Sequence, residues 1–95
     1  MKTPLFSVII PAHNEEKYIG KCLEAIKKAS APFASGDVQI IVSANRCTDR
    51  TADIAKSYGA EVRENEVRSI SGVRNSGAAL AKGNIIVFID ADSLM

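Results

Sequence analysis

The sequence lacks tryptophan, has only two cysteines, and contains no long apolar run. A membrane helix needs about 20 consecutive apolar residues, and no stretch approaches that length. Twelve basic and eleven acidic side chains leave a formal net charge of +1, which gives no electrostatic case for a nucleic acid or an anionic membrane. The whole sequence is 46% hydrophobic and 24% charged, a composition typical of a soluble globular domain.

The cysteines and the start of the chain indicate a cytoplasmic protein. Cys22 and Cys47 form no C-x-x-C pair, so neither a zinc site nor a redox motif is predicted. We expect two reduced thiols, with a disulfide or a reactive cysteine as the alternatives. The first apolar stretch is interrupted by Pro11 and followed by Glu15 and Glu16, which is not the pattern of a signal peptide.

Four short apolar runs alternate with three helical patterns. The runs lie at residues 5–10, 38–42, 60–63 and 85–89, and all but the third are rich in β-branched residues and nearly continuous. Such runs are typical of strands buried on both faces of a parallel sheet. The order β-α-β-α-β-α-β predicts an α/β fold, Rossmann-like, with three α/β/α layers around a mostly parallel sheet. We expect a single domain over residues 1–95.

The helices are expected at about residues 15–29, 48–58 and 69–82. Glu15 and Glu16 would lie in the first turn of the first helix, where the helix dipole favours negative charge. Thr48 or Asp49 would cap the second, and Gly59 would end it in a left-handed conformation. A serine, at position 69 or 71, would start the third.

Polar residues follow every predicted strand, at residues 11–15, 43–49, 64–66 and 90–92. In a parallel sheet these clusters lie along one edge, where open α/β sheets bind their ligands. The pattern predicts a nucleotide or phosphate ligand. Neither G-x-x-x-x-G-K-[ST] nor G-x-G-x-x-G follows a strand, so a P-loop and a dinucleotide fingerprint are not supported.

Asp90 and Asp92 end the last apolar run as an Asp-x-Asp pair. Side chains at alternate positions of an extended segment point the same way, so the two carboxylates are expected to converge on one hard cation. Mg²⁺ or Mn²⁺ held by one or two carboxylates usually completes its coordination with substrate phosphates and water. The pair is short, and a solvated acidic loop is the alternative.

Four segments resemble, in order, the motifs of family 2 glycosyltransferases of the GT-A fold. They are SVIIPAHNEEKYIGKCLEAI, VSANRCTDRTADIAKSYGA, the G-x-x-x-A-x-G pattern within residues 72–83, and VFIDAD. The resemblance covers nearly the whole chain. It implies transfer of a sugar, usually with inversion, from a nucleotide diphosphate donor to an acceptor hydroxyl. The implied partners are a UDP- or GDP-linked sugar and Mg²⁺ or Mn²⁺, with the acceptor left open.

The resemblance also implies roles for single residues. Donor-binding residues would be Pro11, Ala12, Asn14, Glu15, Asn45, Arg74 and Asp90, and the metal ligands would be Asp92 and Asp90. Within this set Pro11, Ala12 and Glu15 would lie against the nucleoside. Asp90 would lie near the ribose or the donor sugar, and Asp92 would bridge the metal to the diphosphate.

The second loop departs from the family pattern. Ala44 and Asn45 stand where one or two aspartates usually contact the base, and because an amide both accepts and donates, the base preference is open. Arg46 replaces a common Gly or Asn and is expected as a surface residue or a phosphate contact. His13 is expected as a loop histidine, with a nucleotide contact as the alternative. Arg74 is expected to place positive charge near the diphosphate, or else to be a solvated helix residue.

The family also needs an acceptor-binding half with a general base, and no residue of this chain is expected to serve. We therefore expect the donor-binding half of a truncated GT-A domain, inactive alone, with an exposed sheet edge that favours self-association. A parent enzyme at the inner face of the membrane is left open. The alternatives are a non-catalytic nucleotide-binding or assembly module and, less well matched, a haloacid dehalogenase-like phosphatase, whose Asp-x-Asp belongs on the first strand.

Overall fold

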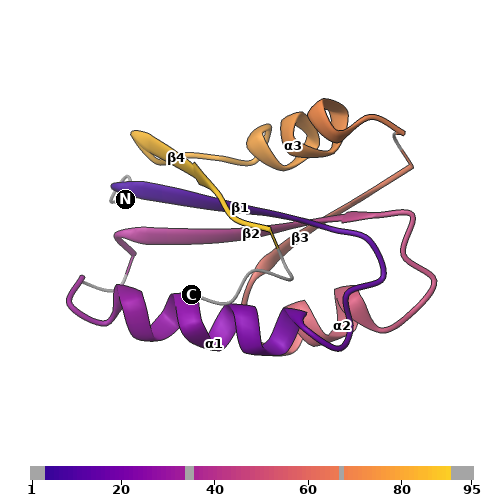
Figure 1. Cartoon of the computed structure of the whole chain (residues 1–95). Helices are drawn as coiled ribbons and strands as arrows, with labels where there is room; N and C mark the ends of the chain where they lie inside the picture. The colour runs from indigo at the N-terminus through magenta and orange to yellow at the C-terminus, as the bar shows by residue number, and fades with distance from the viewer. Residues whose placement is uncertain (1–3, 34–35, 67, 91–95) are drawn as a thin grey trace.

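The computed structural model describes residues 4–33, 36–66 and 68–90. Within them the elements are β1 (Phe6–Ala12), α1 (Ile19–Ser30), β2 (Val38–Asn45), α2 (Thr51–Ser57), β3 (Glu61–Asn65), α3 (Ile70–Ala78) and β4 (Ile85–Phe88). All strand pairs are parallel, in the order β3-β2-β1-β4. Helices α1 and α2 cover one face of the sheet and α3 covers the other (Figure 1). The predicted Rossmann-like α/β fold is confirmed.

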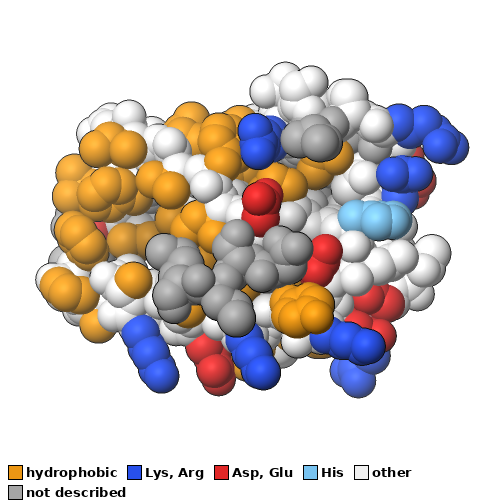
Figure 2. Space-filling model, in the orientation of Figure 1, with side chains coloured by type: hydrophobic (Ala, Val, Ile, Leu, Met, Phe, Trp, Pro, Cys, Tyr) orange, Lys and Arg blue, Asp and Glu red, His pale blue; other side chains and the backbone are white. Residues whose placement is uncertain are grey.

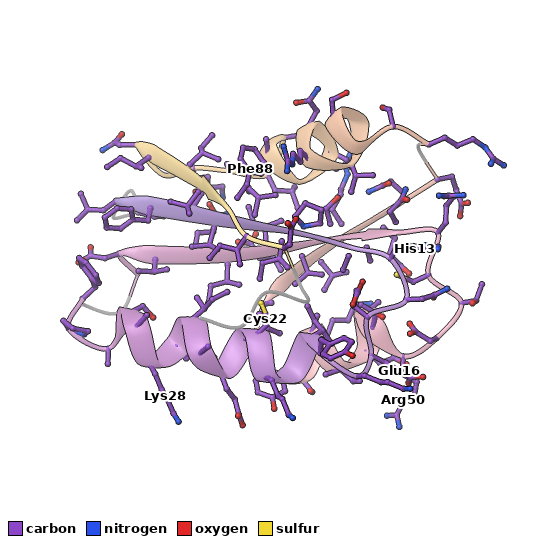
Figure 3. All side chains as sticks on the ribbon, viewed as in Figure 1. His13, Glu16, Cys22, Lys28, Arg50 and Phe88 are labelled. Carbon is purple, nitrogen blue, oxygen red and sulfur yellow. The ribbon has the colours of Figure 1, made fainter. Side chains whose placement is uncertain are left out.

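The main hydrophobic core lies between the sheet and α1 with α2. Apolar residues recur three and four positions apart on α1, which places them on one face of the helix. The buried members of this core are Val8, Ile10, Ala12, Ile19, Cys22, Leu23, Ile26, Val42 and Ala55. Cys22 points from α1 toward the sheet (Figure 3), and burial raises the pKa of its thiol. Cys22 and Cys47 are both free, in line with the reduced thiols expected.

The opposite face of the sheet is partly polar although it is buried. Beside Ile9 and Ile41 it carries four polar side chains, which we call the polar layer: Ser7, Gln39, Ser43 and Asn45. Because a buried polar group without a partner is costly, each needs hydrogen bonds. Ser7 donates to Gln39 Oε1 at 2.7 Å, and Ser43 donates to the carbonyl oxygen of Val73 in α3 at 2.7 Å. Hydrogen bonds therefore join α3 to the sheet.

Two glycines allow α3 and the segment after it to approach β1 closely. A Cβ atom on Gly77 would lie 2.6 Å from Ile9 Cγ2, and one on Gly83 would lie 2.6 Å from the carbonyl carbon of Phe6. Gly83 N also donates to Ser7 Oγ at 2.7 Å. The G-x-x-x-A-x-G pattern is thus explained by packing against the sheet.

The prediction that β4 is buried on both faces is wrong. Ile85, Ile86 and Phe88 are 51%, 45% and 43% exposed, because β4 is an edge strand that pairs with β1 alone among the described strands. Figure 2 shows hydrophobic side chains gathered at the left of the molecule, where β4 begins. The apolar runs of β1 and β2 do correspond to strands buried on both faces, as expected.

α1 begins at Ile19, later than predicted, so Glu15 and Glu16 precede the helix and do not lie in its first turn. The N–H groups of Glu15 and Glu16 donate to Thr51 Oγ1 and Asp49 Oδ2, at 2.9 and 3.2 Å. The chain therefore runs beside the loop after β2 before it turns into the helix.

The other two helices also differ at one end. α2 begins at Thr51 with Arg50 at its N-cap, not at position 48 or 49, while Gly59 has the expected left-handed conformation with φ of 83°. Ser69, one of the two predicted starts, is the N-cap of α3, and its side chain accepts from Gly72 N, but the helix ends at Ala78. The helix stops early because the segment after it forms hydrogen bonds with the buried Gln39 side chain. Gln39 Nε2 donates to the carbonyl oxygen of Leu80, and Gln39 Oε1 accepts from Lys82 N. Across the described part of the chain, no helix has the length and apolar character required to span a bilayer.

Candidate functional site

A cleft of about 480 Å³ lies where β1 and β2 end, beside the start of α3. This volume is within the range of small-molecule sites. Its lining consists of Pro11, Ala12, His13, Glu15, Asn45, Arg46, Arg68, Ser69, Val73, Arg74 and Asp90. Every described residue predicted to bind the donor lines this cleft except Asn14. The carboxyl edge of the sheet thus brings together side chains from four separate parts of the sequence, as parallel topology requires.

His13 joins the loop after β1 to the end of β2. Its Nδ1 lies 2.7 Å from the carbonyl oxygen of Asn45, which can only accept, so Nδ1 carries the proton. Figure 3 shows His13 at the end of the sheet where these two loops meet. His13 is therefore both a loop histidine, as expected, and a residue of the cleft wall.

Asn14 has a different place from the one its motif suggested. Its φ of 50° is left-handed, and its Oδ1 accepts from the backbone N–H groups of Thr48 and Asp49 at 2.8 and 3.3 Å. Asn14 N also donates to Cys47 Sγ at 3.4 Å. These bonds join the loop after β1 to the loop after β2, and Asn14 does not line the cleft.

Asp49 and Thr51 complete the connection between the loops. Asp49 accepts from the backbone N–H groups of Thr51 and Glu16, and also from the Thr51 hydroxyl. Burial by itself would raise the pKa of the Asp49 carboxyl, but these hydrogen bonds lower it below its ordinary value. Asp49 and Thr51 therefore bind the backbone of Glu16 and Glu15, and Glu15 lines the cleft.

Asn45 is 5% exposed and lines the cleft. Its Nδ2 donates to Asn65 Oδ1 at 2.7 Å, and its Oδ1 accepts from Arg46 Nε at 3.3 Å. Asn65 lies outside the lining, whereas Arg46 belongs to it. Asn45 therefore connects Asn65, outside the lining, with Arg46, which belongs to it.

Arg46 has φ of 48°, a conformation that Gly and Asn adopt more readily than other residues. This explains why the family commonly has Gly or Asn here. The conformation is held by Arg46 N, which donates to the carbonyl oxygen of Asn65 at 2.9 Å. An unfavourable backbone conformation retained in a cleft is a frequent mark of a functional residue.

Arg74 and Asp90 lie on the α3 side of the cleft, one on the helix and one just after β4. The guanidinium carbon of Arg74 lies 5.5 Å from the centre of the Phe88 ring, within the range of a cation–π contact. Arg74 is therefore oriented by β4 rather than simply solvated. It supplies positive charge to the same cleft that receives the Asp90 carboxylate.

Sequence reasoning missed Arg68, Ser69 and Val73, which also line the cleft. The expected helix start at Ser69 was the available signal, because a helix that begins after β3 must begin at the same edge of the sheet. Arg68 adds a third guanidinium to those of Arg46 and Arg74. Three arginines around one cleft suit an anionic ligand.

Metal ligands are only partly described. Asp90 and Glu15 place carboxylates on the cleft, and such oxygens are the donors that Mg²⁺ and Mn²⁺ prefer. Asp92, the other predicted ligand, lies outside the described residues. No group of three or more His, Cys, Asp or Glu side chains suited to a metal occurs among the residues described.

The fold and the cleft define an α/β domain with arginines and carboxylates at the carboxyl ends of parallel strands, the edge at which open α/β sheets bind ligands. Comparison with known proteins is more specific. The sequence profile of glycosyl transferase family 2 matches residues 7–95, and the chain belongs to this family.

Similar proteins include 4,4'-diaponeurosporenoate glycosyltransferase of Staphylococcus aureus, 38% identical over 92 residues, covering 90% of this chain and 23% of that protein. Putative glycosyltransferase EpsH of Bacillus subtilis is 32% identical over 97% of this chain and 27% of its own length. The chain thus spans about a quarter of the length of these relatives.

Solved structures agree with this assignment. The crystal structure of glucosyl-3-phosphoglycerate synthase from Mycobacterium tuberculosis, in complex with Mn²⁺, uridine-diphosphate and glucosyl-3-phosphoglycerate, superposes with a TM-score of 0.73. It is 32% identical to this chain and is matched over 93% of this chain and 33% of that one. The GT-A fold expected from the motifs is confirmed.

Proposed function

We propose that this chain is the donor-binding portion of a glycosyltransferase, and that its cleft holds a nucleotide diphosphate sugar. The observation that carries the proposal is the composition of the cleft. Pro11, Ala12 and Asn45 line it together with Arg46, Arg68 and Arg74, which bring positive charge to it. A nucleoside needs the first kind of surface and a diphosphate needs the second.

A divalent ion, Mg²⁺ or Mn²⁺, suits the carboxylates of Asp90 and Glu15 in the cleft lining. Asp90 would hold it together with Asp92, and when bound it would neutralise charge on the departing diphosphate. Uridine-diphosphate and Mn²⁺ are present together in the similar synthase from M. tuberculosis, which supports this ligand set.

The residues of this chain would bind and orient the donor. Arg74, oriented by Phe88, would stabilise negative charge on the diphosphate oxygens as the glycosidic bond breaks. Attack by the acceptor hydroxyl needs a general base, and we place that group, and the inversion it implies, in a part of the enzyme outside this chain. The whole enzyme would then be a cytoplasmic glycosyltransferase, with membrane association a further hypothesis.

Calorimetry with UDP, GDP and ADP, each with and without Mn²⁺, tests this proposal. We expect a nucleoside diphosphate to bind at least tenfold more tightly with Mn²⁺, and we expect Asp92→Ala to remove this dependence. Asp53→Ala, a carboxylate on the exposed side of α2, is the control and should bind like the unmodified chain. Binding of no nucleotide would overturn the proposal and favour a non-catalytic assembly module.

The exposed apolar surface of β4 supports the expected self-association. Ile85, Ile86 and Phe88 lie on an edge strand, and unpaired edges with apolar side chains favour pairing between chains. Light scattering over a range of concentrations measures this association. A monomer at the highest concentration would contradict it.

A further inference from the structure

Asn65 lies outside the cleft but contacts two of the elements that line it. It is the last residue of β3 and pairs with Asn45 in the sheet. Its Nδ2 donates to Ser43 Oγ in β2 at 3.0 Å and to Ser76 Oγ in α3 at 3.2 Å. Its Oδ1 accepts from Asn45 Nδ2 at 2.7 Å. The amide of one side chain therefore joins the ends of two strands to the helix.

α3, which covers one face of the sheet (Figure 1), is held there largely by polar contacts. Of the α3 residues whose burial the structure describes, only Val73 and Gly77 are buried. Ser43 Oγ donates to the carbonyl oxygen of Val73 at 2.7 Å and accepts from Asn65. Hydrogen bonds weaken steeply away from their preferred geometry, whereas apolar contact is non-directional. We therefore expect these bonds to set the position of α3, and with it that of Arg74.

Asn65 also contacts the loop after β2, through its backbone. Arg46 N donates to the carbonyl oxygen of Asn65 at 2.9 Å, and this bond holds Arg46 in its left-handed conformation. Because Asn65 ends β3, its side-chain bonds to Ser43 and Asn45 restrain a carbonyl group at the very end of the strand. Asn65 thus restrains both Arg46 and the helix that carries Arg74.

We propose that Asn65 is a positioning residue that holds Arg46 and Arg74 in a fixed arrangement, so that the two guanidinium groups bind one anionic ligand together. This inference rests on the proposed nucleotide diphosphate function. Long side chains lose rotamer freedom on binding, and a fixed origin for each limits that loss. Asparagine suits the role because its amide supplies two donors and an acceptor, whereas aspartate lacks the donors and leucine lacks both.

The test measures the affinity for UDP with Mn²⁺ by calorimetry. Asn65→Leu keeps roughly the size of the side chain and removes its hydrogen bonds to Asn45, Ser43 and Ser76. We expect its Kd for UDP to rise about tenfold, the effect of one lost hydrogen bond to a charged group. Arg46→Ala and Arg74→Ala should each raise the Kd by a similar factor, about tenfold.

Double variants show whether Asn65 acts through the arginines. Independent effects multiply, so two tenfold losses would combine to about a hundredfold loss. When Arg46 or Arg74 is already absent, Asn65→Leu has only one guanidinium left to misplace. We therefore expect it to raise the Kd by only about threefold in the Arg46→Ala or the Arg74→Ala background. A residue that served stability alone would have the same effect in every background.

Ser76→Ala is a milder variant that decides the question if Asn65→Leu does not fold. It removes the bond from Asn65 to α3 and keeps the bonds of Asn65 to Ser43 and Asn45. We expect the Kd for UDP to rise about threefold, the effect of one neutral hydrogen bond. This rise should persist in the Arg46→Ala background and disappear in Arg74→Ala, because only α3 is affected.

Ser7→Ala is the matched control for a general loss of stability. It removes a buried hydroxyl of the same polar layer, bonded to Gln39 and Gly83. The folded fraction of every variant is measured by circular dichroism, and the Kd is calculated for the folded protein. The Kd of Ser7→Ala should equal that of the unmodified chain.

The outcomes separate this inference from the function on which it rests. Failure of the unmodified chain to bind UDP would overturn both. UDP binding that is unchanged in the Asn65 and Ser76 variants would overturn the inference alone, and so would losses that multiply fully in the double variants or an equal loss in Ser7→Ala. Smaller losses in the double variants, with Ser7→Ala unaffected, would support it.

Discussion

The guanidinium of Arg74 lies 5.5 Å from the centre of the Phe88 ring, which joins a helix and an edge strand across one wall of the cleft. Arg74 comes from α3 and Phe88 is the last residue of β4. Phe88 lies on the α3 side of the sheet (Figure 3). An exposed aromatic side chain on an edge strand thus has a specific partner, and that partner is a cleft residue.

Removing the aromatic ring should weaken binding of the diphosphate. In Phe88→Leu, Arg74 loses a contact of about 0.5–1 kcal/mol that restricts its position. We expect a two- to fivefold higher Kd for UDP with Mn²⁺, measured by calorimetry. Phe33→Leu is the matched control, since Phe33 is equally exposed and packs edge-on against Phe6, away from the cleft. Equal effects of the two variants would contradict the role given to Phe88.

Replacing Arg46 by glycine should raise stability and lower affinity together. A left-handed conformation costs a non-glycine residue about 1–2 kcal/mol, and glycine avoids most of that cost. Arg46→Gly should therefore unfold at a higher urea concentration yet bind UDP more weakly, because a guanidinium is lost from the cleft. Arg46→Ala should lose the same affinity without gaining stability. A stabilising effect of both variants would argue against backbone strain at this position.

Gly83→Ala should be strongly destabilising. The added Cβ would lie 2.6 Å from the Phe6 carbonyl carbon and 2.7 Å from Ser7 N, and backbone atoms in a paired strand cannot move aside. Overpacking of this kind costs about 1–3 kcal/mol, and we expect the upper part of that range in urea unfolding. Gly59→Ala meets no atom within 4 Å but has φ of 83°, so its cost is conformational alone, about 1–2 kcal/mol. A smaller loss of unfolding free energy in Gly83→Ala than in Gly59→Ala would show that the segment around residue 83 shifts freely.

Asp49 should make stability depend on pH in the acid range. Hydrogen bonds outweigh the effect of burial and lower the pKa of this carboxyl in the folded state below the ordinary 3.8. The carboxylate therefore contributes stability above that value, and the contribution is lost as the pH falls through the lower folded pKa. The difference in unfolding free energy between the unmodified chain and Asp49→Asn should be largest near neutrality and shrink on acidification. Glu64→Gln, on the exposed surface of β3, is the control; an Asp49 difference that stays constant with pH would contradict the assignment.

Local sequence patterns predicted the helices and strands well because backbone preferences and burial in the sheet determine them. The β-branched runs of β1 and β2, the left-handed Gly59 and the serine at the start of α3 all follow from backbone preferences. The exposure of β4 could not be predicted in this way. An apolar run is the same whether the strand lies in the centre of a sheet or at its edge.

The sequence predicted which loops form the candidate site, but not what each residue in them contacts. Asn14 lies just after β1 and Asn45 ends the neighbouring strand β2, yet Asn14 binds the backbone of the adjacent loop while Asn45 lines the cleft. The difference depends on partners that are 20 or more residues away in sequence, as Asn65 is from Asn45. Arg68 was missed because it lies in a segment without a motif and enters the cleft only through the position of α3.

The bonds that join the loops after β1 and β2 have a thermodynamic consequence. They involve backbone groups and the short side chains of Asn14, Asp49 and Thr51, which have few rotamers left to restrict. The two loops at this edge of the cleft are therefore preorganised, and the entropic penalty of ligand binding falls mainly on the long arginine side chains of the lining. Association at this site should be governed by the ordering of guanidinium groups, with little rearrangement of the main chain.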